Sequence, residues 1–101
     1  MIDRIELNLN INNKEEKVVI DGKELTITSN NGITKHISRG VILKLLSFIK
    51  NWKDSYGEEE KKNKDTAHMV FDYGTLTKTF DFEGAFPKNF RAFVSFIEAI
   101  R

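Results

Sequence analysis

Two histidines and a few strand carboxylates are the side chains of this 101-residue chain best suited to chemistry. His36 and His68 fall in different predicted strands, and neither has a second His or a Cys at metal-ligand spacing. If His36, His68 and Asp72 met in a concavity, they would form an enzyme site or a small-ligand site. We interpret the two histidines and these carboxylates as ordinary polar residues of the strands. The chain also contains no nucleophile elbow and no glycine-rich phosphate loop, which removes the common catalytic and phosphate-binding motifs. We therefore predict a protein that is not an enzyme and that holds no metal or other cofactor.

Charge and composition narrow the function further. The chain contains sixteen Lys and Arg residues and fifteen Asp and Glu residues, which gives a net charge of +1. Duplex nucleic-acid binders normally carry a basic excess, because phosphate neutralisation dominates their affinity, so nucleic acid is not the expected partner. The absence of Cys excludes disulfides and thiolate metal sites. No long apolar run follows the first residues, so we predict neither a signal peptide nor a membrane span and expect a cytoplasmic protein. Nine Asn residues and many Lys and Ile residues are typical of an AT-rich bacterial or phage genome.

The first forty residues have the alternation of β-strands. Ile5, Leu7 and Leu9 alternate with polar residues, a period of two that predicts a half-buried strand. Three further strands follow by residue 37, separated by turn residues. Asp21-Gly22 is typical of a two-residue hairpin turn in which both residues have positive φ.

The period then changes to that of a helix. Apolar residues recur every three or four positions from Val41 to Trp52, and Ser38 is the expected N-cap. This helix should end near Asp54. We expect residues 55–65, which contain no large aliphatic side chain, to form a charged loop.

A hairpin and a second helix complete the chain. Alternation over 68–82, interrupted by Tyr73-Gly74, predicts two strands, with Leu76, Phe80 and Phe82 directed inward. The closing helix is expected over 86–100, with Pro87 in its first turn. The order ββββ-α-ββ-α predicts a single α+β domain spanning 1–101, with about six antiparallel strands in one sheet and both helices on one face.

In this arrangement the other face of the sheet is polar and is the largest surface left for function. The expected interaction surface consists of strand residues on that face together with two aromatic residues at the end of the first helix and the start of the charged loop. Its members are Arg4, Glu6, Lys17, Thr26, Thr28, His36, Trp52, Tyr56, Thr77 and Thr79. The alternative is the charged loop over 54–64. Trp and Tyr are common interface anchors, but we favour a role for Trp52 in closing the core beneath the 55–65 loop.

The segment Gly84-Ala85-Phe86-Pro87-Lys88-Asn89-Phe90-Arg91-Ala92-Phe93 is distinctive. Together with the preceding Trp52 and hairpin, it resembles a C-terminal pattern of small uncharacterised bacterial proteins. This chain has Asp65-Thr66 where that pattern has Asp-Gly. The resemblance covers the last half of the chain and implies no catalytic residue, but some such proteins resemble immunity proteins encoded beside toxins. It also suggests that Asn89 bonds the preceding hairpin.

We therefore predict a protein-binding module, of inhibitor or immunity type. One alternative is single-stranded nucleic-acid binding through Arg4, Lys17, Lys35 and Lys78. Another is an accessory protein of a phage or mobile element. A homodimer formed by an exposed edge strand also remains open.

Overall fold

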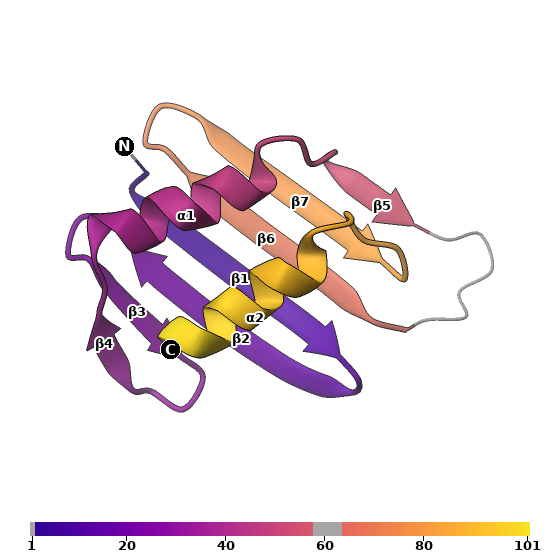
Figure 1. Cartoon of the computed structure of the whole chain (residues 1–101), viewed down its shortest axis with the longest axis horizontal. Coiled ribbons are helices and arrows are strands. Elements are labelled where there is room, and N and C mark those ends of the chain that lie inside the picture. The colour runs from indigo at the N-terminus through magenta and orange to yellow at the C-terminus, as the bar shows by residue number, and fades with distance from the viewer. Residues whose placement is uncertain (1, 58–63) are drawn as a thin grey trace.

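The computed structural model describes residues 2–57 and 64–101 of the chain. Within these ranges the chain forms an α+β fold of one sheet and two helices, as predicted (Figure 1). In chain order the elements are β1 (Arg4–Ile11), β2 (Lys14–Asp21), β3 (Thr26–Ser29), β4 (Thr34–His36), α1 (Arg39–Ile49), β5 (Ser55–Gly57), β6 (Thr66–Asp72), β7 (Thr77–Glu83) and α2 (Phe90–Ile100).

The sheet has seven strands in the order β4-β3-β2-β1-β6-β7-β5. Five of its six pairings are antiparallel, and β5 pairs with β7 in parallel. The prediction of a purely antiparallel sheet of about six strands therefore missed one short edge strand. That strand lies in the predicted 55–65 loop, of which residues 58–63 lie outside the described residues.

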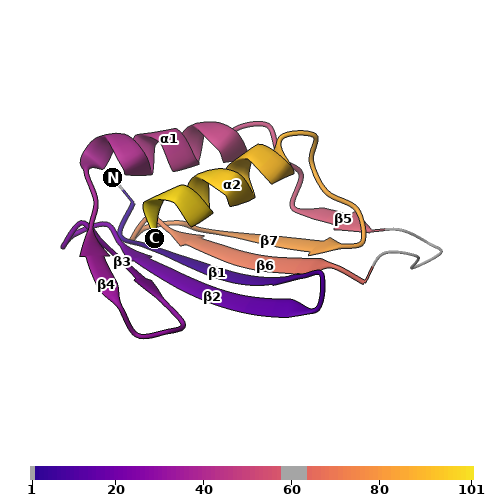
Figure 2. The same cartoon turned by 60° about the horizontal axis from the view of Figure 1, so that its bottom comes forward.

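Both helices cover the same face of the sheet, and the opposite face is bare (Figure 2). We call the face beneath the helices the inner face and the bare one the outer face. The core lies between the helices and the inner face, where α2 places Phe90 with its ring 5.8 Å from that of Phe82 in β7. The ring of Phe48 in α1 lies 5.8 Å from that of Phe93 in α2. These contacts join both helices to one aromatic core.

Helix α1 begins where the sequence predicts and ends earlier. The Ser38 hydroxyl accepts a hydrogen bond from the Val41 N–H at 3.3 Å, which satisfies one of the free donors of the first turn. The last helical residue is Ile49, not a residue near Asp54. Beyond Ile49 the Trp52 N–H bonds the Ile49 carbonyl at 3.1 Å, and the Trp52 side chain packs against the core.

Helix α2 begins at Phe90, four residues after the predicted start at Phe86. Pro87 lies in the turn before the helix, where its carbonyl accepts from the Phe90 N–H at 3.0 Å. The resemblance suggested that Asn89 bonds the preceding hairpin, but its side chain makes a different contact. It bonds the end of α1 instead, by donating Nδ2–H to the Phe48 carbonyl at 2.9 Å.

Two turn predictions were wrong. Gly22 does not have positive φ, and the β2–β3 connection spans four residues, with the positive φ of 55° at Leu25. Gly22 is needed for a close approach, because a Cβ there would lie 2.1 Å from the Ile2 carbonyl oxygen. Leu76 precedes β7 in the turn and is 58% exposed rather than directed into the core.

Candidate functional site

The register of the sheet defines the composition of the outer face. Residues paired across neighbouring strands point to the same face of the sheet, and consecutive residues of one strand point to opposite faces. The neighbours of each inner-face residue along its strand therefore lie on the outer face. The outer face carries, from β4 to β5, Thr34, His36, Thr26, Thr28, Glu15, Lys17, Val19, Asp21, Arg4, Glu6, Asn8, Asn10, Thr66, His68, Val70, Asp72, Thr77, Thr79, Asp81, Glu83 and Ser55. It therefore includes eight of the ten residues of the predicted interaction surface; the other two are Trp52 and Tyr56.

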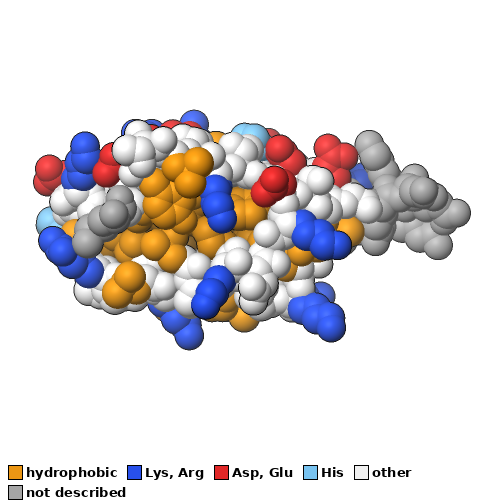
Figure 3. All heavy atoms as spheres, turned by 90° about the horizontal axis from the view of Figure 1, so that it is seen from above, with side chains coloured by type: hydrophobic (Ala, Val, Ile, Leu, Met, Phe, Trp, Pro, Cys, Tyr) orange, Lys and Arg blue, Asp and Glu red, His pale blue; other side chains and the backbone are white. Residues whose placement is uncertain are grey.

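The outer face is acidic, although the chain as a whole has a net charge of +1. Its strands contribute six carboxylates, Glu6, Glu15, Asp21, Asp72, Asp81 and Glu83, but only two permanent cations, Arg4 and Lys17. Figure 3 shows carboxylates together with some Lys or Arg side chains along the upper border, on the sheet side, whereas the charged side chains of the lower border are Lys or Arg. In the described part of the chain, the sheet side therefore carries more negative charge than the helix side.

The middle of the outer face contains a histidine-carboxylate pair. The Nδ1 atom of His68 in β6 bonds Oδ1 of Asp81, its cross-strand partner in β7. On the other side of His68, β1 and β2 contribute Asn8 and Lys17 to the same cross-strand row. A shallow depression of about 390 Å³ lies beside this row and is lined by Asn8, Lys17, His68 and neighbouring polar residues. Both partners of the pair are exposed, with side-chain exposures of 50% and 60%.

The second histidine lies far from this pair. His36 is in β4, which is four strand spacings from β6, so about 19 Å of sheet separates the two rings. Asp72 lies on the same strand as His68 and its Oδ1 accepts from the Gly74 N–H at 2.8 Å in the adjoining turn. The three residues considered for an enzyme or small-ligand site therefore do not converge. Among residues 2–57 and 64–101, no cluster of three metal-ligating side chains is present either.

Arg4, at the start of β1, is the cross-strand partner of Asp21, at the end of β2, and each makes contacts with nearby residues. The Arg4 guanidinium pairs with Glu6 at 2.7 Å, and both side chains are well exposed. The Asp21 carboxylate accepts from the backbone N–H groups of Glu24 at 3.0 Å and Lys23 at 2.8 Å. These bonds hold the pKa of Asp21 below its ordinary value of 3.8, because they favour the ionised form.

Trp52 and Tyr56 lie on the helix side of the sheet. The Trp52 ring packs edge-on against Phe80, Phe82 and Phe93, with centroid distances of 5.8, 5.4 and 5.1 Å. Tyr56 in β5 packs against Phe82 at 5.0 Å. The interpretation of Trp52 as a residue that closes the core is confirmed, and neither aromatic side chain joins the outer face.

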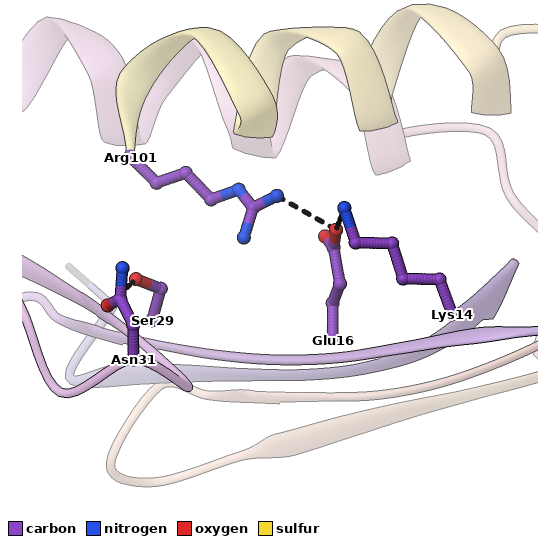
Figure 4. A network of polar contacts seen from close by, with 5 residues as sticks. All are labelled: Lys14, Glu16, Ser29, Asn31 and Arg101. Atoms are coloured by element: carbon purple, nitrogen blue, oxygen red, sulfur yellow. Dashed lines mark hydrogen bonds and ion pairs between the residues drawn. The ribbon is translucent and has the colours of Figure 1, made fainter.

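An ion pair between β2 and the end of α2 was missed in the sequence. Glu16 shares the inward parity of Val18 and Ile20, and only 9% of it is exposed. Its Oε1 lies 2.8 Å from the Arg101 guanidinium and 3.5 Å from Lys14 Nζ. Figure 4 shows both basic side chains directed at the Glu16 carboxylate. An acidic residue at an inward strand position was the available signal. The pair fastens the last turn of α2 to the sheet and lies on the opposite face from the His68 row.

The four cations considered for nucleic-acid binding do not share a surface. Arg4 and Lys17 lie on the outer face, whereas Lys35 and Lys78 occupy inner-face register positions near the opposite edges of the sheet. A single strand of nucleic acid could not contact all four along one groove.

None of the helices in the described ranges is long and apolar enough to cross a membrane. Comparison of the chain with known protein families, curated proteins and solved structures finds no match. The resemblance to small bacterial proteins therefore stays a prediction.

Proposed function

We propose that this chain is a non-enzymatic binding module whose acidic outer face recognises a basic surface of another protein. The observation that carries the proposal is the charge of that face, which holds six carboxylates and two permanent cations on a chain of net charge +1. Charge segregated onto one face steers encounter with an oppositely charged partner.

The open shape of the outer face is better suited to binding another protein than to catalysing a reaction. His68 and Asp81 lie on an open strand surface, and both are at least half exposed. Efficient acid-base or electrostatic catalysis needs a site that excludes water. The broad, twisted face instead provides many separated polar contacts, which suit the rim and core of a protein interface.

An inhibitor or immunity role follows from the same chemistry. Proteins that act on nucleic acids carry Lys and Arg where they contact phosphates. An acidic face can cover such a surface and block it. The partner is accordingly expected to be a basic protein, and a toxin that acts on nucleic acid is the specific class we propose.

Affinity capture from a bacterial host with matched charge variants tests this function. Glu15→Lys with Asp81→Lys reverses two outer-face charges, whereas Lys88→Glu with Arg91→Glu reverses two exposed charges on the helix side. We expect the wild type and the helix-side variant to retain the same basic protein and the outer-face variant to lose it. Equal retention by all three forms, or turnover of a substrate by the purified chain, would contradict the proposal.

A further inference from the structure

Half of the edge of β7 has no strand beside it in the described part of the chain. β5 pairs only with the last three residues of β7, and the Asp81 N–H donates to the Asp54 carbonyl at 2.9 Å on that side. Alternate residues of a strand direct their N–H and C=O groups to opposite sides. Thr77 and Thr79 share the parity of Asp81, so they direct two N–H and two C=O groups toward a position beside β7 that no strand of residues 2–57 or 64–101 occupies.

The side chains around this half-edge are apolar and basic. Lys78 occupies an inner-face register position but is exposed. Leu76, just before the strand, is 58% exposed. Figure 3 looks from the side where β7, β5 and α1 lie in Figure 1, and it shows a hydrophobic area with Lys and Arg side chains set into it. An added strand would meet both apolar surface and positive charge here.

A second copy of this chain fits the half-edge poorly. Two copies of β7 paired antiparallel about Lys78 would place this lysine directly opposite its own copy. Like charges directly opposite one another destabilise a strand pair, and lysines on edge strands are a common device against self-pairing. The occupant that complements Lys78 carries a carboxylate.

We propose that the first half of β7 accepts an extended segment of the partner protein as an additional strand. This segment carries an acidic residue opposite Lys78 and an apolar residue opposite Leu76, two positions away on the same side. Its alternate residues point to the outer face, where Asp72 and Asp81 favour basic side chains. The proposal rests on the protein-binding function above and adds the surface and the sequence pattern that would be recognised.

Selection of a random twelve-residue peptide library on the full chain tests the proposal. We expect enriched peptides to carry Asp or Glu two positions from a large apolar residue. Thr79→Pro removes an edge N–H without removing a β6–β7 hydrogen bond, and it should weaken peptide binding about tenfold. Lys78→Glu should weaken binding about fivefold. Both variants should keep the fold, because residue 79 bonds toward the open side and residue 78 is exposed.

The opposite edge of the sheet supplies a matched control. Lys35 has the same inner-face position in β4 that Lys78 has in β7, and it lies at the opposite edge of the sheet. Lys35→Glu should therefore leave peptide binding unchanged.

Amide hydrogen exchange identifies the surface that the peptide covers. Bound peptide should slow exchange at Thr77 and Thr79. Three results would overturn the edge proposal: no enrichment, full binding by Lys78→Glu and Thr79→Pro, or slowing that depends on protein concentration without peptide, which would indicate a second copy. If enriched peptides bind these variants normally but lose binding to Glu15→Lys with Asp81→Lys, the edge inference fails while the proposed protein-binding function stands.

Discussion

Trp52 and Asn89 are joined by a 2.6 Å hydrogen bond in which the indole Nε1–H donates to the side-chain Oδ1. The same carboxamide donates Nδ2–H to the Phe48 carbonyl at 2.9 Å, so it satisfies an acceptor in the last turn of α1. One residue before α2 thus fixes both the end of α1 and the ring that closes the aromatic core.

Replacing Asn89 tests this double role. Asn89→Ala should lower the free energy of unfolding by about 1–2 kcal/mol, because it removes a donor and an acceptor from partly buried partners. Asn89→Asp keeps the acceptor for Trp52 but places a carboxylate against the Phe48 carbonyl, so it should cost at least as much. Urea unfolding measures both, with Lys88→Ala as the exposed neighbouring control. Asn89→Asp as stable as wild type would contradict the proposed bond to Phe48.

Three glycines should respond differently to alanine. Gly22→Ala should destabilise by about 2 kcal/mol or more, since its Cβ would lie 2.1 Å from the Ile2 carbonyl oxygen. Gly32→Ala meets no neighbouring atom but has a φ of 81°, so strain alone should cost about 1 kcal/mol. Gly40→Ala lies in the first turn of α1 and should stabilise by about 0.5 kcal/mol.

Thermal and urea unfolding of the three variants check this order. The predicted ranking places Gly40→Ala above wild type and Gly22→Ala lowest. A mild effect at Gly22 would show that Ile2 does not pack against the β2–β3 connection as closely as the structure indicates.

The Glu16–Arg101 pair predicts a double-mutant result. Arg101→Met should destabilise by about 2 kcal/mol, because Glu16 keeps its charge at 9% exposure and retains the more distant Lys14, at 3.5 Å, as its partner. Glu16→Leu combined with Arg101→Met should recover to within about 1 kcal/mol of wild type, since apolar replacement of a buried pair is often neutral. Chemical unfolding of the two single variants and the double variant measures the coupling, and strictly additive losses would contradict it.

The Asp21 carboxylate predicts a pH dependence. Its pKa is held below 3.8 by the Glu24 and Lys23 N–H groups, so the folded state favours the ionised form. The stabilisation it contributes is therefore present above pH 3.8 and is lost as the pH falls through the lowered pKa. Asp21→Asn should reduce the thermal midpoint at pH 7, and its difference from wild type should shrink toward pH 2. A difference independent of pH would contradict this origin.

Sequence periodicity predicted most of the core correctly. Ile5, Leu7 and Leu9 alternate as expected and are almost fully buried, and Ile42 and Leu45 occupy the buried face of α1. This succeeded because burial on one side of a strand or helix imposes the repeat directly. The polar outer face followed from the same parity.

The remaining features depend on contacts between distant segments. β5 has three residues and one half-buried side chain, so no period can form, and its pairing partner lies some 26 positions away. Position 22 requires glycine because the Ile2 carbonyl approaches it closely. The Asn89 side chain bonds the Phe48 carbonyl at the end of α1, which is distant in the sequence. The acidity of the outer face could be recognised only from the strand register. The net charge of the chain does not reveal it, because that value averages the acidic outer face with the basic helix side.

Carboxylate footprinting of the complex with the captured partner is the most direct test of the central claim. A carbodiimide reagent labels exposed Asp and Glu side chains in the free chain and in the complex. We predict protection of Glu15, Asp72 and Asp81 on the outer face and unchanged labelling of Glu98 in α2. Protection of Glu98 with unchanged labelling of the three outer-face carboxylates would contradict recognition through the acidic face.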